Sequence, residues 1–156
     1  YYQGSPIRHD MTDAGWLQWH ERHRRPAYNM GVAFLRKEGY VSLEVSADAA
    51  EGVVETRPLR YRGRHLFVNA DGSRGAVRVE LCDVAGTPLA GFGRDRAVPL
   101  KTDGLNHLVR WAQEGDLSRF AGQAVVLRFH LAPGAKLYAY RFGGSDPHLD
   151  LRRREP

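Results

Sequence analysis

The sequence predicts an all-β fold, an antiparallel β-sandwich of jelly-roll type with an extended segment at its N-terminal side. Three observations lead to this expectation. Short stretches of alternating apolar and polar residues recur at intervals of about 10 to 15 residues, turn-forming residues separate them, and no amphipathic helix pattern of ordinary length occurs. The chain has 156 residues, 42% of them hydrophobic, which is enough for one substantial core and leaves no room for a second domain of ordinary size.

The strongest strand signal lies at residues 125–131. Apolar side chains occupy every second position there, the spacing of a strand with one buried and one wetter face: Val125, Leu127, Phe129 and Leu131. Residues 132–135 have the composition of a turn, and residues 137–142 are expected to return as a second strand. That strand carries three aromatic rings on one face: Tyr138, Tyr140 and Phe142. The two strands together predict a β-hairpin.

The remaining elements are shorter. Residues 116–122 suit a single helical turn that lets the chain cross from one sheet to the other. Further strands are expected at residues 28–36, 40–45, 52–57, 65–69, 75–83, 89–92 and 106–111. In the second of these Val41, Leu43 and Val45 should face the core. We therefore divide the chain into an N-terminal segment (1–30), the sandwich (31–145) and a polar, basic tail (146–156).

The charge distribution limits the classes of partner. The net charge of +5 would suit nucleic acid or a membrane surface, but many arginines alternate with apolar residues as on a solvated sheet face: Arg78, Arg110, Arg128 and Arg141. No basic helix or aromatic-studded nucleic-acid motif is evident, so we expect no nucleic-acid partner. No apolar run approaches the roughly 20 residues that span a bilayer, so we expect no membrane segment. The single cysteine, Cys82, does not identify a compartment.

The sequence carries no clear catalytic or metal constellation. Glu44 and Glu80 fall on strand faces expected to be solvated, and Cys82 lies in mid-strand, where a thiol is usually inert. His20 and His23 are three residues apart, but a third metal ligand at suitable spacing is not evident. We therefore predict no catalytic residue, no metal and no cofactor for this chain.

The best candidates for ligand binding lie near the N-terminus. Trp16 and Trp19 occur in a polar region, together with Arg8, His9 and His20. Exposed aromatic faces flanked by polar side chains are typical of sugar sites on β-sandwiches. The alternative is that both tryptophans cover the sandwich or face another domain.

A family resemblance rests on the order of several motifs. GVAFLRKEGYVSLEV is followed by HLFVNADGSRGAVRVELCDVAGTPLAGF, then by DLSRFAGQAVVLRFHL and LYAYRF, over residues 31–142. This series resembles the C-terminal β-sandwich of bacterial glycosidase-like proteins that carry a five-bladed β-propeller of the furanosidase and arabinanase-like clan. The opening YYQGS resembles a strand of the last propeller blade, which implies that the chain is cut inside its parent. By the same resemblance, Arg8 and His9 would reach toward the active-site mouth of that parent.

The resemblance implies a function without catalysis in this chain. In the propeller family three acidic residues on early blades carry the reaction, and no residue here matches them. We expect a non-catalytic accessory domain of a glycoside-hydrolase-like protein that packs on the missing upstream propeller and contacts carbohydrate. Two alternatives stay open, an independent carbohydrate-binding module and a chain that completes the propeller of a glycosidase. The compartment would be extracellular or periplasmic if the parent is secreted.

Overall fold

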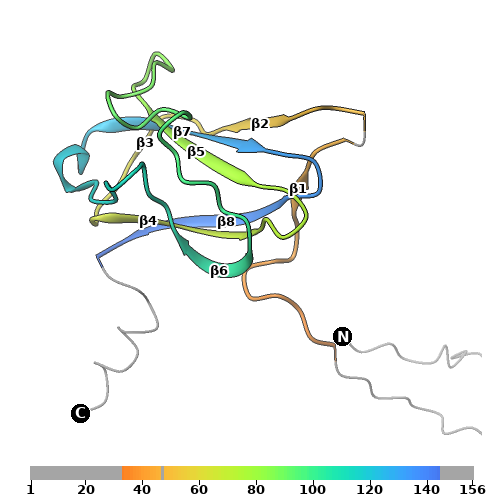
Figure 1. Cartoon of the computed structure of the whole chain (residues 1–156). Coiled ribbons are helices and arrows are strands. Elements are labelled where there is room, and N and C mark those ends of the chain that lie inside the picture. Colours follow the sequence, from red (N-terminus) through yellow and green to blue (C-terminus); the bar gives the residue numbers. More distant parts are fainter. Residues whose placement is uncertain (1–32, 47, 145–156) are drawn as a thin grey trace, which may run out of the picture. The chain divides into compact units, whose positions relative to one another are not determined.

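The computed structural model describes residues 33–46 and 48–144 (Figure 1). The chain divides into two units, Tyr1–Leu35 and Arg36–Pro156, and every strand described here belongs to the second. In that unit two antiparallel sheets enclose one hydrophobic core, which confirms the predicted all-β, antiparallel sandwich. Its jelly-roll topology stays a prediction, as do the three predicted segments of the chain.

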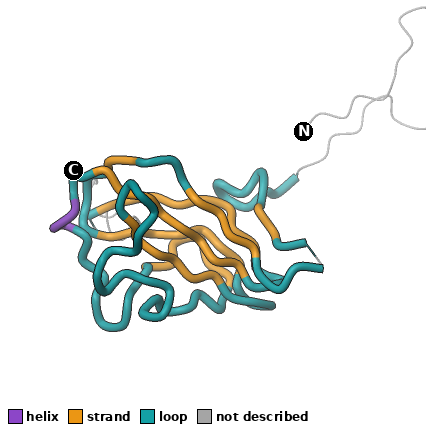
Figure 2. The backbone as a smooth tube through the Cα atoms, turned by 90° about the horizontal axis from the view of Figure 1, so that it is seen from above, coloured by secondary structure: helices purple, strands orange, loops and turns teal. Residues whose placement is uncertain are grey.

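The first sheet has four strands in the order β1 (Leu43–Glu44), β8 (Lys136–Gly143), β4 (His65–Asp71) and β6 (Asp103–Leu108). The second sheet is built around β7 (Ala124–Leu131). This strand pairs with β5 (Val77–Cys82), β2 (Gly52–Glu55) and β3 (Leu59–Arg60). Figure 2 shows the strands from above, with the loops that connect them. All pairings are antiparallel, so each sheet can bury one face and expose the other.

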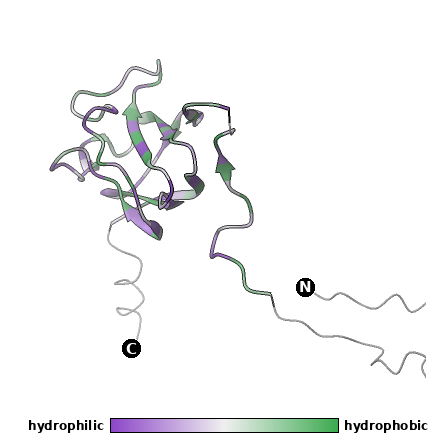
Figure 3. Ribbon diagram, turned by 45° about the vertical axis from the view of Figure 1, so that its right-hand side comes forward, coloured by the Kyte–Doolittle hydropathy of each residue, from purple (hydrophilic) through white to green (hydrophobic). Residues whose placement is uncertain are grey.

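The core forms where the inner faces of the two sheets meet. Leu66 and Val68 of β4 and Val77 and Leu81 of β5 have no exposed surface, and Figure 3 shows apolar colour on these strands. The period of two predicted from the sequence therefore decides which side chains of these strands face the core. Trp111 completes the core from a loop, with 1% of its surface exposed.

The predicted hairpin is wrong. β7 and β8 follow one another in the chain, but they lie in different sheets, and the turn at residues 132–135 carries the chain between the layers. In this turn the amide of Ala135 donates to the carbonyl of Ala132 over 3.1 Å. Apolar periodicity predicts the two strands, but it does not say which neighbour each strand pairs with.

A bulge in β8 overturns the prediction that three aromatic rings share one face. Tyr140 pairs with Val68 and Leu137 pairs with Ala70, so the register shifts by one residue and skips Tyr138. Residues directly opposite in a sheet share a face, so Leu137 and Tyr140 turn toward the core. Tyr138 turns outward instead, where the Arg36 guanidinium lies 4.5 Å from its ring centroid.

The predicted single turn is confirmed. A 3-10 helix, η1 (Ser118–Phe120), follows β6 of the first sheet and precedes β7 of the second, so the chain crosses between the layers here. Asp116 accepts from the Ser118 amide at its start over 2.8 Å. The Tyr61 hydroxyl donates to the carbonyl of Leu117 over 2.6 Å, and burial raises the pKa of Tyr61 to about 12. The first bond is local to the turn, and the second holds the crossing against the core.

The predicted strand at residues 40–45 is largely wrong. Only Leu43–Glu44 is strand, and Val41 and Leu43 are 73% and 48% exposed instead of facing the core. β1 is the outermost strand of its sheet, so little structure covers it; Val45 alone of the three packs against the core. The strands predicted at residues 28–36 and 89–92 are not observed, since residues 33–36 and 89–92 are not strand and residues 28–32 lie outside the described part. β3 was not predicted from the sequence.

Candidate functional site

The sequence-predicted ligand site cannot be placed. Its five residues lie outside the residues that the structure describes: Arg8, His9, Trp16, Trp19 and His20. Their proposed role stays a prediction. Trp111, Tyr138 and Tyr140 are aromatic residues of the sandwich itself. Trp111 is buried and donates its indole N–H to the carbonyl of Val79 over 2.7 Å, whereas Tyr140 is 40% exposed and Tyr138 faces outward.

A polar network covers the outer face of the second sheet. Alternate residues of β5 and β7 face the core, so the residues between them point outward. In the antiparallel register Arg78 lies opposite His130, and Glu80 lies opposite Arg128. The sheet thus places one acid–base pair, Glu80 and Arg128, directly opposite each other, and it places His130 diagonally across from Glu80.

Glu80 is the centre of this network. It is 7% exposed, which corrects the prediction that it lies on a solvated face. One carboxylate oxygen accepts from the Arg94 amide over 2.9 Å, and the other from the Arg128 guanidinium over 3.0 Å. The amide of Arg94 belongs to the loop at residues 84–97, which packs over this part of β5 and excludes water from the carboxylate. The complementary charges on the two strands were visible in the sequence, but the covering loop was not.

His130 lies between two carboxylates. Its Nε2 is 3.0 Å from Glu80, its Nδ1 is 3.5 Å from Glu51, and 8% of the residue is exposed. Neither contact has the geometry of a hydrogen bond, so both buried ring nitrogens lack a hydrogen-bond partner among the described residues. A neutral imidazole carries one N–H, whereas the imidazolium form carries two and can donate toward both acids. Arg94 pairs with Glu51 on the same side and extends the network to β2.

The surroundings of Glu80 keep it ionised. Burial by itself would raise the pKa of this carboxyl group, but the contacts with His130, the Arg94 amide and Arg128 outweigh burial and leave the pKa lowered. The other carboxyl groups of the described part with a clear shift also have a lowered pKa: Glu44, Asp71 and Asp116. A general acid for glycoside hydrolysis needs a raised pKa. None of these four groups therefore suits that role.

An open depression lies beside the network. It has a volume of about 650 Å³ and is lined by side chains of both charges, among them Arg78, Glu80, Arg94 and Asp95. Arg78 donates to the carbonyl of Ala97 over 2.7 Å, which fixes one wall. Such a depression can hold a small polar ligand by hydrogen bonds, since its polar groups are already held in place.

Cys82 belongs to the same strand and is fully buried. Burial raises the pKa of its thiol, so little of it is ionised near neutral pH. This agrees with the predicted inert cysteine. Among the residues the structure describes, no group of three or more His, Cys, Asp or Glu side chains could hold a metal ion.

A second surface feature is apolar. Tyr40 and Val41 are 84% and 73% exposed, and Leu43 of the edge strand β1 follows them with 48% exposed. Three large apolar side chains within four residues are unusual for a free surface. They lie in the unit that begins at Arg36, whose side chain is bound to the outer face of the first sheet through Asn69 and Asp103.

No helix in the described part of the chain is long and apolar enough to cross a membrane. In comparisons with known proteins, no family model, no curated protein and no solved structure matches this chain. Its function therefore has to be argued from the residues themselves.

Proposed function

We propose that this chain acts as a non-catalytic accessory β-sandwich of a glycoside-hydrolase-like protein, and that it packs against the upstream β-propeller and contacts carbohydrate. The observation that carries the proposal is the exposed apolar stretch Tyr40, Val41 and Leu43 beside an edge strand. Exposed apolar side chains near a strand edge are a common docking surface for another domain. The resemblance of the motifs at residues 31–142 to the sandwich of propeller-bearing proteins favours a β-propeller as this partner domain.

The electrostatics of the sandwich support a role without catalysis. The outer-face carboxylates are held by arginines, Glu51 by Arg94 and both Glu55 and Glu80 by Arg128. The lowered pKa of Glu80 makes this carboxyl group a poor proton donor at neutral pH.

The experiment that tests the proposal uses the gene product as cells express it. Its intact mass and sequence establish whether a propeller precedes Tyr1, and a product without one would refute the proposal. With a propeller present, the double variant Tyr40→Ser/Val41→Ser should separate one thermal unfolding transition into two, because the interface is weakened. Val84→Ser removes another exposed valine, 61% exposed and on a distant loop, and should leave the transition single.

An independent carbohydrate-binding module is the second candidate. It is favoured by the depression of about 650 Å³ beside Glu80, whose polar walls are held in place by internal hydrogen bonds. Sugar binding by a product that has no propeller would support this candidate over the first.

A further inference from the structure

A second cavity lies at the end of the sandwich where two loops meet. It has a volume of about 470 Å³, within the range of small-molecule sites, which runs from about 300 to 1,000 Å³. Phe92 and Trp111, each 1% exposed, lie beneath it with ring centroids 5.1 Å apart, and Arg96 and Arg119 line its walls. The network around Glu80 contributes no residue to it.

Both guanidinium groups keep free donors. Arg119 stacks over the rings of Phe92 and Phe120, at 4.9 and 4.7 Å from their centroids, and has no hydrogen-bond acceptor among the described residues. Arg96 has only the Asp95 carboxylate, 3.9 Å away, which is beyond hydrogen-bond distance. Stacking holds the Arg119 guanidinium by its face, so the N–H groups at its edge stay available to an anion.

The opposite wall is a tight turn at residues 111–114. The Trp111 amide donates to the Glu114 carbonyl over 2.7 Å, and the Glu114 amide donates back to the Trp111 carbonyl over 2.9 Å. Ala112 has a φ of 52°, a left-handed conformation that residues with a Cβ atom rarely adopt. Its amide donates to the carbonyl of Arg96 over 2.7 Å, so the strained residue ties the two loops together. Backbone strain of this kind is concentrated at ligand and active sites.

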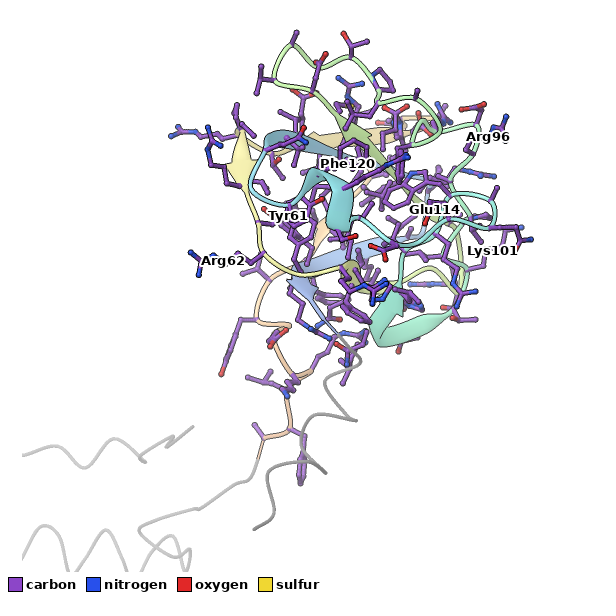
Figure 4. All side chains as sticks on the ribbon, turned by 90° about the vertical axis from the view of Figure 1, so that its left-hand side faces the viewer. Tyr61, Arg62, Arg96, Lys101, Glu114 and Phe120 are labelled. Carbon is purple, nitrogen blue, oxygen red and sulfur yellow. The ribbon has the colours of Figure 1, made fainter. Side chains whose placement is uncertain are left out.

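The same turn presents an acceptor. One oxygen of the Glu114 carboxylate accepts from the amides of Gly115 and Asp116, over 3.0 and 2.9 Å. Its other oxygen has no donor within the described part of the chain. The exposed amide of Gln113 stands beside it and can both donate and accept. In Figure 4, Arg96 and Glu114 lie on one side of the unit, and Arg62 lies on the opposite side.

We propose that this cavity, lined by Arg96, Arg119 and Glu114, binds a carboxylate-bearing sugar ring of the uronic acid class. The ligand carboxylate would accept from the arginines, whose paired N–H groups match a carboxylate in shape and charge. Its ring hydroxyls would donate to Glu114 and exchange hydrogen bonds with Gln113. A simple anion without hydroxyl groups would be repelled by the Glu114 carboxylate. A neutral sugar would leave both arginines without an anionic partner. The site does not depend on the docking proposed above, because the sandwich supplies all its residues.

The test compares ligands that differ in one group. Methyl glucuronide and methyl galacturonide carry a carboxylate where the matching methyl glucoside and galactoside carry a hydroxymethyl group. In an NMR titration of the full chain, one uronide should shift the amide signals of residues 96 and 112–114 and bind at least about tenfold more tightly than its neutral partner. No binding by either uronide, equal binding of a matched pair, or equally tight binding of inorganic phosphate would each refute the proposal.

Variants then locate the site. Arg96→Gln should weaken uronide binding by about tenfold, since it removes a charge-assisted hydrogen bond without touching the core. Arg62→Gln removes an exposed arginine outside the cavity and should leave the affinity unchanged. Uronide binding that survives Arg96→Gln and falls with Arg62→Gln would place the site elsewhere and overturn the proposal. An unchanged spectrum away from the cavity shows that each variant is folded.

Discussion

Replacing Glu80 by glutamine removes the charge at the centre of the outer-face network and preserves the shape of the side chain. The wild-type carboxylate, of which 9% is exposed, contacts the Arg94 amide, Arg128 and His130 at 2.9 to 3.0 Å. Removing one partner of a buried ion pair costs about 3 to 5 kcal/mol. Arg128 keeps Glu55, 2.7 Å away, so we expect a loss at or just below the lower limit of this range, about 2 to 3 kcal/mol in the free energy of unfolding.

Urea unfolding followed by tryptophan fluorescence at neutral pH measures this loss. The matched control is Glu55→Gln, which removes a charge from the same Arg128 at a side chain that is 47% exposed. Exposed pairs contribute little, so the control should lose less than about 1 kcal/mol. A loss for Glu80→Gln no larger than that of the control would refute our account of the buried network.

The pH dependence has a definite sign. The pKa of Glu80 is lower in the folded protein than in the unfolded chain, so its contribution is present above the ordinary carboxyl value, about 4.3, and is lost as the pH falls through the folded value. The difference in stability between wild type and Glu80→Gln should therefore shrink as the medium is acidified below about pH 4. If the difference in stability between wild type and Glu80→Gln stayed constant down to pH 2, the charge of Glu80 would not be the source of that difference.

Three further predictions concern the core. Trp111→Phe should lose about 2 to 4 kcal/mol in urea unfolding, because it leaves a cavity and an unpaired Val79 carbonyl; a loss under about 1 kcal/mol would contradict this. Gly72→Ala should lower the midpoint of thermal unfolding, since its Cβ would lie 2.2 Å from the backbone oxygen of Leu100, whereas an unchanged midpoint would mean that the backbone yields freely. The Cys82 thiol should resist a thiol reagent in the folded protein and react in urea, and rapid labelling without urea would be inconsistent with its burial.

The part of the candidate sites that could be read from sequence was the pattern of charges. Arg78 and Glu80 alternate on one strand and Arg128 and His130 on its neighbour, and this places four ionisable groups on the outer face of one sheet. The sequence did not show that the loop after β5 folds back over Glu80. Solvation of a strand face depends on which segments fold over it, so the prediction of a wetter face failed there.

The second cavity had no motif of its own. Arg96 and Glu114 are 18 positions apart in the sequence. They line the same cavity because a backbone hydrogen bond from Ala112 to Arg96 joins their two loops. The left-handed conformation of Ala112 has no signal in the residue type, since alanine disfavours it. A glycine there would have marked a turn.

The sequence by itself determined the class of fold and the local elements with regular signals. The alternation at residues 125–131 and 77–82 decided which side chains face the core, and the short segment before β7 was confirmed as a single turn. These features depend on neighbours along the chain, where a period of two or a capping residue is enough.

Only the tertiary structure decided the partners of the strands. β8 follows β7 in the chain but pairs with β4 in the other sheet. The bulge that skips Tyr138 decides which aromatic rings of β8 face inward. The same holds for Tyr40 and Val41, which remain exposed because β1 is an edge strand. Strand pairing is settled by the packing of residues distant in sequence, and the free energy that selects it depends on the whole assembled core.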